Sequence, residues 1–229
     1  MQAKDDRARK PHSSSPTKRA TGSKAHNRAL KPGDRYDANI DHILRAAATV
    51  FAEKSFGLAS IRDIAAHAHI SFPRIYYYLR NKEELLYQIS KRAFEQLRSH
   101  ADQVVAKVDD PEEKLRLFIT AHLDYHMNNI AEMKVLVREA DSLSRRYATN
   151  IARLKRDYSR LCRKIIEQVA AKHGKNIDRD ESRILTSLLF GAMNWFYTWY
   201  EPSRDSELRG KIVDEVNRMV SSAIATRPN

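Results

Sequence analysis

Arginine, tyrosine and lysine side chains gather in a short stretch of the sequence, between residues 74 and 82. Arg74 can bond to guanine or phosphate through two parallel hydrogen bonds, while tyrosine hydroxyls and Lys82 can bond to phosphate oxygens. Tyr76, Tyr77 and Tyr78 follow one another, so a short helix cannot bury all three. The pattern fits nucleic-acid binding, but it also fits a helical hairpin whose tyrosines belong to the core.

Two short helices joined by a tight turn are predicted to hold these side chains. The first spans residues 60–68, with Ser60 as its N-cap and Asp63 close to the capping-box position. The second runs from about residue 72 to residue 79, and Ser71 can cap it. This arrangement is the helix-turn-helix unit, whose second helix can enter the major groove of DNA.

The sequence around this unit resembles the DNA-binding domain of the TetR family of bacterial repressors, over residues 37–97. Several blocks match in order and spacing: Ala47–Phe51 with Gly57, Ser60–Ala65, Ile70–Ser71, Ile75–Tyr77 and Asn81–Leu85. The resemblance implies that the family's DNA-contact positions are occupied here by Ser60, Arg62, Ser71, Phe72, Arg74, Tyr76, Tyr77 and Lys82.

Two departures from the family pattern lie in and after the turn. The family often has glycine where His69 stands, and histidine tolerates a left-handed backbone at some cost. It often has a small or polar pair where Phe72 and Arg74 stand. The departures leave the fold intact, but an operator sequence cannot be borrowed from relatives.

Composition places the chain among all-α proteins. No stretch reads as a strand, and the single Cys162 excludes a disulfide framework and fits a reducing cytosol. The N-terminus lacks an apolar leader, and the longest apolar run, Leu188–Tyr200, has 13 residues, too few to span a bilayer. We expect a cytoplasmic protein, associated with the nucleoid through DNA, with no membrane partner and no cofactor.

Charge is concentrated near the N-terminus. The whole chain carries a formal net charge of +12, and residues 1–35 hold ten Lys and Arg against three Asp. We expect residues 1–36 to form a disordered basic tail. The tail either adds salt-sensitive contacts to DNA phosphates or is a solvated leader with no fixed role.

The predicted organisation is a three-helix DNA-binding domain over residues 37–97, followed by a helical effector-binding and dimerisation domain over residues 98–226. The first helix is predicted over residues 37–55, where apolar residues repeat at three- and four-residue steps, and Gly57 is its expected C-cap. A fourth helix, from Asn81 to about Ala106, is long enough to join the domains. The TetR resemblance implies that moving its far end changes the spacing of paired heads.

The last two helices are the expected surface for a homodimer. The helix over residues 180–200 is apolar nearly all round in its second half, so it needs partners on two sides. The resemblance implies pairing through a four-helix bundle, with these interface residues: Leu189, Met193, Leu208, Ile212, Val216, Met219, Val220 and Ala223. The alternative is that the last helix only closes a monomer core.

An aromatic stretch, Gly191–Tyr200, resembles a segment of TetR-like regulators that respond to fatty acyl-CoA or related CoA thioesters. A small hydrophobic effector, such as an acyl-CoA, is therefore expected to contact His122, Tyr125, His126, Tyr158, Asn194, Trp195 and Trp199. Five cations are available for CoA phosphates: Arg138, Arg145, Arg146, Lys155 and Arg183. The alternatives are a free drug-like or aromatic effector, or aromatics that serve only as core.

A metal-dependent enzyme is the alternative from another class. His122 and His126 are four residues apart, so they can share a helix face, but no third ligand is placed by spacing. The sequence holds no phosphate-binding glycine loop, no nucleophile elbow and no paired cysteines. Regulation of transcription is therefore the favoured function.

Overall fold

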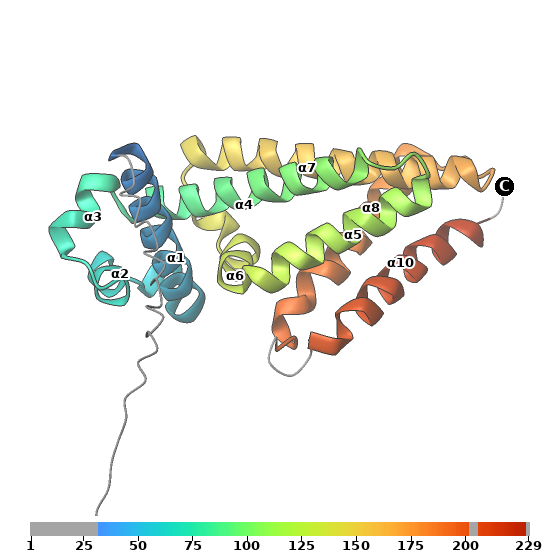
Figure 1. Ribbon diagram of the computed structural model, residues 1–229. Coiled ribbons are helices and arrows are strands. Elements are labelled where there is room, and N and C mark those ends of the chain that lie inside the picture. The colour runs from blue at the N-terminus through green and yellow to red at the C-terminus, as the bar shows by residue number, and fades with distance from the viewer. Residues whose placement is uncertain (1–31, 202–205, 228–229) are drawn as a thin grey trace, which may run out of the picture.

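The computed structural model describes residues 32–201 and 206–227, and these residues form helices and turns with no β-strand. This confirms the all-α class. A small head, made by α1 (Pro32–Leu58), α2 (Ile61–His67) and α3 (Phe72–Tyr78), lies at one end of an elongated helical body (Figure 1). The body consists of α4 (Lys82–Val105), α5 (Pro111–Asn128), α6 (Ile130–Arg138), α7 (Arg145–Lys172), α8 (Arg179–Asn194) and α10 (Arg209–Ala225).

The first helix differs from its prediction at both ends. It begins at Pro32, so residues 32–36 belong to α1, and the rest of the predicted tail lies outside the described residues. Near its other end Ser55 adopts a positive φ of 65°, which breaks the helix there. Gly57, the predicted C-cap, is therefore not the left-handed residue, because Ser55 takes the turn two positions earlier.

The turn of the helix-turn-helix unit is fixed by local chemistry. Ser60 Oγ accepts the Asp63 backbone N–H at 3.1 Å, and Asp63 Oδ2 accepts the Ser60 N–H at 2.8 Å, which completes the predicted capping box. His69 adopts a φ of 52°, the left-handed conformation expected at the family's glycine position. Both features orient α3 relative to α2.

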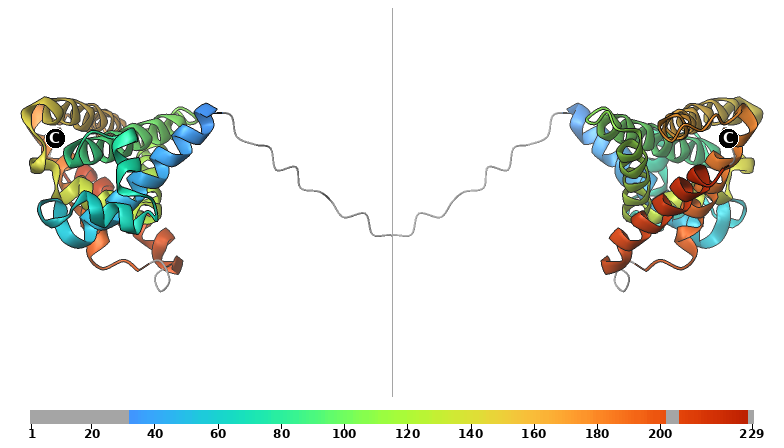
Figure 2. Two further views of the ribbon diagram at one scale, coloured as in Figure 1. Left: turned by 90° about the vertical axis from the view of Figure 1, so that its left-hand side faces the viewer. Right: turned by 90° about the vertical axis from the view of Figure 1, so that its right-hand side faces the viewer.

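Helix α4 joins the head to the body (Figure 1). It begins after Asn81, whose side chain accepts the Glu84 N–H at 2.8 Å. Its buried face runs from Leu85 to Val105, and the helix packs against α1, α5, α6 and α7. The end-on views show the head in front of the body from one side and α10 along an outer edge from the other (Figure 2).

The helix α8 ends earlier than predicted. It stops at Asn194, and residues 195–198 form a tighter 3-10 turn. In that turn Thr198 Oγ1 donates to the Trp195 carbonyl at 2.7 Å, and the Tyr200 N–H donates to the Phe196 carbonyl at 3.1 Å. The aromatic stretch therefore does not share one continuous α-helical face.

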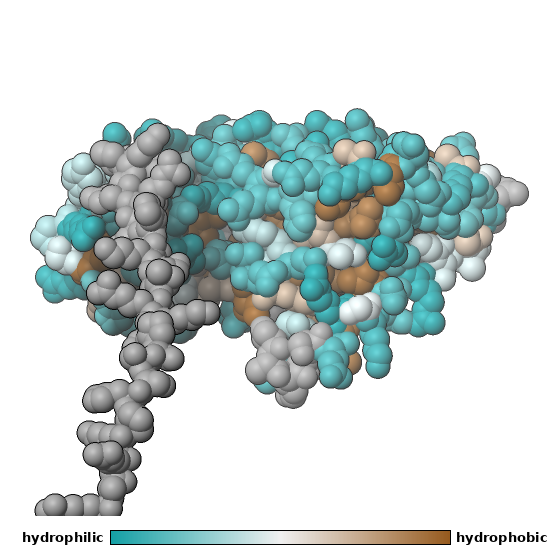
Figure 3. All heavy atoms as spheres, in the orientation of Figure 1, coloured by the Kyte–Doolittle hydropathy of each residue, from teal (hydrophilic) through white to brown (hydrophobic). Residues whose placement is uncertain are grey.

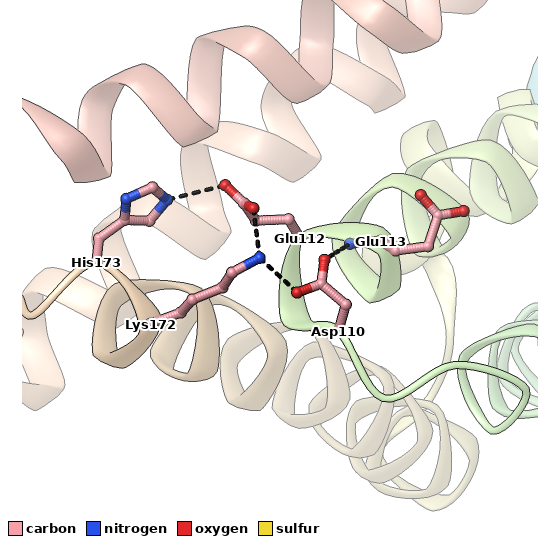
Figure 4. A network of polar contacts seen from close by, with 5 residues as sticks. All are labelled: Asp110, Glu112, Glu113, Lys172 and His173. Carbon is pink, nitrogen blue, oxygen red and sulfur yellow. Dashed lines mark hydrogen bonds and ion pairs between the residues drawn. The ribbon is translucent and has the colours of Figure 1, made fainter.

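Ion pairs tie the far ends of α5 and α7 together (Figure 4). Lys172 Nζ bonds Asp110 and lies 2.6 Å from Glu112 Oε2, while His173 Nε2 lies 2.9 Å from Glu112 Oε1. The bond from the Lys172 ammonium, assisted by His173, lowers the pKa of Glu112. Asp110 also caps α5 by accepting the Glu113 N–H at 3.1 Å.

The face of the molecule turned to the viewer in Figure 3 is mainly hydrophilic, with separate hydrophobic patches on the body. Among the described helices, none is both long and apolar enough to cross a membrane. The apolar residues are instead gathered into a core that runs from the head through the body.

Candidate DNA-reading surface and effector cavity

The second helix of the helix-turn-helix unit turns its basic and aromatic side chains outward. On α3 itself, Ile75 is fully buried, whereas Tyr76 and Tyr77 are 48% and 75% exposed. Arg74 is exposed as well. The alternative that these tyrosines belong to the core is therefore wrong for Tyr76 and Tyr77, while Tyr78 is half-buried against α1.

A residue that the sequence did not single out supports this surface. Asn39 on α1 donates through Nδ2 to the Tyr78 hydroxyl at 3.0 Å, and its Oδ1 accepts a bond from Arg74 Nη2 at 3.4 Å. Phe72 packs edge-on to Tyr76 at 5.2 Å between ring centroids, and the Arg62 guanidinium lies 5.7 Å from the Phe72 ring centre. Arg62 is thus supported by an aromatic ring, and Arg74 is supported by Asn39.

Three other residues predicted to contact DNA differ in whether their side chains already make hydrogen bonds within the protein. Lys82 is committed within the head: its Nζ donates to the carbonyls of Phe56 at 2.6 Å and Ala59 at 2.8 Å. The prediction that Lys82 contacts a phosphate is therefore wrong for this structure, because its ammonium binds carbonyls at and just after the end of α1. Ser60 is exposed, but its hydroxyl is held in the capping box. Ser71 is exposed and makes no side-chain cap bond.

The helical body encloses a cavity of about 370 Å³ between α4, α5, α6, α7 and α8. Its apolar lining comes from Phe94, Leu97, Met133, Leu136, Val137, Ile151 and Phe190. The volume falls in the range of about 300–1,000 Å³ typical of small-molecule sites. Exposed members of the lining, including Val137, Lys155 and Gly191, place the mouth between α6, α7 and α8.

Three of the predicted effector residues meet in the cavity wall although they come from different helices. His122 Nδ1 lies 3.2 Å from the Tyr158 hydroxyl, and His122 Nε2 lies 3.3 Å from Asn194 Oδ1. All three line the cavity. Burial, with help from neighbouring His126, lowers the pKa of His122 to about 3, so the ring is neutral at pH 7.

The other four predicted effector residues lie elsewhere. Trp195 and Trp199 are 64% and 46% exposed and do not line this cavity, because the helix changes to a 3-10 turn at Trp195. His126 is buried and faces the Phe196 ring at 6.4 Å between centroids. Tyr125 lines a smaller polar pocket on the side of α4 that faces α1.

Of the five cations considered for CoA phosphates, Lys155 is the one that lines the described cavity. It stands exposed at the mouth, three residues before Tyr158 on α7. Sequence reasoning missed Phe94, Met133 and Phe190, because an apolar residue that lines a cavity has the same spacing as one that fills a core.

The predicted dimer residues divide by exposure. Leu189, Met193 and Val220 are buried inside the protomer, so placing them at the interface is wrong. Ile212 and Val216 are half-buried, whereas Leu208, Met219 and Ala223 are exposed. The exposed apolar residues on α8 are instead Ile184 at 51%, Leu188 at 61%, and Ala192.

The metal-enzyme alternative has no support in the geometry. His122 and His126 do share a face, with ring centroids 6.2 Å apart, but both His122 nitrogens already have hydrogen-bond partners. Within the described part of the chain, no group of three or more potential ligands is close enough to hold a metal ion.

Hydrogen bonds also hold the region where the head joins the body. The Phe56 N–H at the end of α1 donates to Glu139 Oε1 at 3.1 Å, just beyond the end of α6. The Ser144 N–H before α7 donates to Glu83 Oε1 at 2.5 Å, and hydrogen bonding by the Ser144 side chain and by this N–H lowers the Glu83 pKa. The head is therefore bonded to the segment that follows α6, and the first turn of α4, which continues from the head, is bonded to the segment before α7.

A helix-turn-helix head on a helical body that contains an apolar cavity defines a ligand-responsive DNA-binding regulator. Residues 43–89 match the family described as bacterial regulatory proteins of the tetR family, and residues 108–220 match the tetracyclin repressor-like C-terminal domain. The chain belongs to the TetR family of bacterial repressors, whose members are DNA-binding regulators and not enzymes.

Individual relatives agree with this assignment. The transcriptional repressor NicS of Pseudomonas putida is 26% identical over 182 residues, which cover 78% of this chain and 84% of NicS. The structure of PfmR from Thermus thermophilus is 26% identical with a TM-score of 0.67, covering 77% of this chain and 97% of PfmR. AibR, in complex with isovaleryl coenzyme A and operator DNA, is 22% identical with a TM-score of 0.69, covering 79% and 97%.

Proposed function

We propose that this protein is a dimeric repressor that binds a palindromic operator and leaves it when a small hydrophobic effector enters the cavity. The observation that carries the proposal is the course of α4. Its first residue, Lys82, bonds carbonyls of the head, and farther along Phe94 and Leu97 line the cavity. One rigid helix therefore contacts both the DNA-reading domain and the ligand space.

The reading residues follow from exposure. Arg62, Phe72, Arg74, Tyr76 and Tyr77 form one exposed surface on α2 and α3. In this proposal α3 enters the major groove, Arg74 bonds base edges or phosphate, and the tyrosine hydroxyls bond phosphates. Residues 37–97 act as the DNA-binding domain, and the basic segment before them adds salt-dependent affinity.

The proposed dimer surface is the exposed apolar face of the last two helices. On α8 Ile184, Leu188 and Ala192 are exposed at four-residue steps, and on α10 Met219 and Ala223 are exposed four residues apart. Burying this face against a second copy removes large apolar side chains from water. A two-fold pair of heads then requires a palindromic site.

A matched pair of leucines tests the dimer surface. Leu188→Glu places a charge in the proposed interface, whereas Leu58→Glu alters another leucine, 82% exposed, at the end of α1. Sedimentation should show a monomer for the first variant and a dimer for the second. A dimeric Leu188→Glu protein would refute this surface.

For the effector we propose a CoA thioester. Its acyl chain would fill the apolar cavity, and its charged CoA portion would remain outside near Lys155 at the mouth. The complex of AibR with isovaleryl coenzyme A is an example of this ligand class in a protein of the same fold. The enclosed apolar lining also suits a free drug-like or aromatic molecule, which is the second candidate.

Effector binding reaches the head through α4 and α6. Met133, Leu136 and Val137 on α6 line the cavity, and Glu139 just after that helix holds the Phe56 N–H. A ligand that fits better when α4 and α6 shift selects a conformation in which the two heads no longer match successive turns of DNA.

Fluorescence anisotropy of labelled DNA from the gene's own upstream region tests the proposal. We expect tight binding that excess competitor DNA does not abolish, and release by one CoA thioester but not by its free acid. Release by free aromatic molecules alone would favour the second candidate. Absence of specific binding there, and in a genome-wide selection of sites, would refute the repressor.

A further inference from the structure

The polar wall of the cavity is a chain of three side chains whose hydrogen-bond directions can be worked out. His122 lies between the Tyr158 hydroxyl at 3.2 Å and Asn194 Oδ1 at 3.3 Å. A neutral histidine carries one ring proton, so the nitrogen that holds the proton decides the direction of both bonds. Because His122 is buried with its pKa lowered to about 3, it is neutral at pH 7.

The Tyr158 hydroxyl fixes this direction. Tyr158 is 3% exposed, and within residues 32–201 and 206–227 its hydroxyl has His122 as its hydrogen-bond partner. A buried O–H without an acceptor costs about 1–3 kcal/mol. The hydroxyl therefore donates to His122 Nδ1, the proton sits on Nε2, and Nε2–H donates to Asn194 Oδ1.

The direction of these hydrogen bonds determines where the amino group of Asn194 points. Its oxygen is held by His122, so its Nδ2 amino group is directed away from the histidine. Asn194 lines the cavity, and this nitrogen has no hydrogen-bond partner among the residues that the structure describes. A donor in an apolar cavity favours a ligand that brings an acceptor.

We infer that the effector carries a carbonyl oxygen that accepts a hydrogen bond from Asn194 Nδ2, with an anionic group placed at Lys155. This deepens the proposed function and rests on the same cavity. Lys155 stands at the mouth, and among the described ion pairs it has no carboxylate partner. His122 and Tyr158 are positioning residues, because they act on the ligand through the orientation of Asn194.

The histidine tautomer is measurable without any ligand. Protein labelled with ¹⁵N-histidine should give a two-bond proton–nitrogen spectrum in which His122 has a bare Nδ1 and a protonated Nε2. His122→Gln identifies the signal by its loss, and His126→Gln controls for the neighbouring ring. A proton on Nδ1 would reverse both hydrogen bonds and overturn the inference.

The ligand test compares pairs that differ by one oxygen. Calorimetry would measure acyl-CoA thioesters of increasing chain length, from isovaleryl-CoA, against S-alkyl-CoA thioethers in which a methylene replaces the carbonyl. We expect the best thioester to bind at least about tenfold more tightly than its thioether, which corresponds to about 1.4 kcal/mol. Equal affinity for the pair would overturn the carbonyl contact.

A substitution isolates the donor. Asn194→Asp keeps an oxygen for His122 Nε2–H but replaces the amino group with a second acceptor, so it should abolish the preference for the thioester. Ser187→Ala, at the mouth of the cavity, should keep that preference. An unchanged preference in Asn194→Asp would assign carbonyl recognition to another group and overturn the inference.

If neither CoA compound binds, the CoA proposal fails but the donor is still tested. Medium-chain 2-alkanones and the matching 2-methyl-1-alkenes differ only in the oxygen and need no contact at Lys155. Thermal shift and calorimetry should then show binding of the ketone in preference to the alkene. Equal binding, or binding of neither, would overturn the inference even if DNA binding is intact.

Discussion

The reading surface of the head and the wall of the cavity both offer hydrogen-bond donors, but in opposite surroundings. On α3, Arg74, Tyr76 and Tyr77 are exposed, so water competes for their donors and salt screens the charge. In the cavity His122 and Tyr158 are 2% and 3% exposed and bond to each other. An exposed set of donors suits the phosphates and bases of DNA. A buried set of donors disfavours any ligand that leaves the polar groups of the cavity unpaired.

The largest expected contrast between these regions is in their response to acid. Burial lowers the pKa of His122 to about 3 and of His126 to about 4. In the unfolded chain both titrate near pH 6.5, so below that pH the unfolded state binds more protons and stability falls. Each histidine should remove about 2 kcal/mol from the free energy of unfolding between pH 7 and pH 5.

Urea unfolding followed by tryptophan fluorescence measures this loss, because both tryptophans, Trp195 and Trp199, lie in the body. The variant His122→Gln should lose less stability between pH 7 and pH 5 than the parent protein. In the head, the pKa shift of Asp63 has the opposite effect on stability. The bond from Lys54 lowers the pKa of Asp63, so its ionised carboxylate stabilises the fold fully at all pH values above about 4. A parent protein with equal stability at pH 7 and pH 5 would contradict the buried neutral histidines.

The next effect is on DNA. Arg74→Ala should weaken specific binding by about 1–3 kcal/mol if the guanidinium reads a base edge. Arg74→Lys keeps the charge but loses the planar fork, so it should preserve the salt dependence and lose sequence preference. Anisotropy titrations at several salt concentrations, with specific and unrelated DNA, separate the contribution of charge from the contribution of base reading. Unchanged affinity of Arg74→Ala would remove this residue from the reading surface.

A smaller effect is expected at the joint between the two regions. Glu139→Ala leaves the Phe56 N–H without its acceptor, which should cost about 1 kcal/mol. Glu139→Gln retains Oε1 and should remain close to the parent protein. Amide hydrogen exchange at Phe56 reads the bond directly: exchange should be faster in the alanine variant and nearly normal in the glutamine variant. Equal protection in all three proteins would show that the bond does not hold the joint.

The head was largely predictable because its signals are local. The Ser60 capping box and the left-handed His69 are each specified by one or a few neighbouring residues. Lys82 was misjudged for the opposite reason, since its partners are carbonyls of Phe56 and Ala59, more than twenty positions away. A sequence shows that a cation is present, but it does not show which backbone groups the fold brings to it.

The helices of the body were predictable from the sequence, but which of their faces point inward was not. The helix α8 is apolar on several sides, so its pattern does not say whether Leu188 or Leu189 faces inward, and packing decides for Leu189. The cavity wall joins residues 36 and 72 positions from His122. Their chemistry was visible in the sequence, but whether they meet depends on how α5, α7 and α8 pack.

The smallest expected effect is at the far end of the body, where Lys172 bonds Asp110 and Glu112 (Figure 4). These side chains are well exposed, so water and salt weaken the ion pairs, and such pairs contribute about 0–1 kcal/mol. Lys172→Gln should therefore change the urea midpoint only slightly, and even less at high salt. Asp110→Ala, which removes both the ion pair and the helix cap, should cost more than Lys172→Gln. If Lys172→Gln instead destabilised the body as much as acid does, exposed charges and not buried neutral groups would govern its stability.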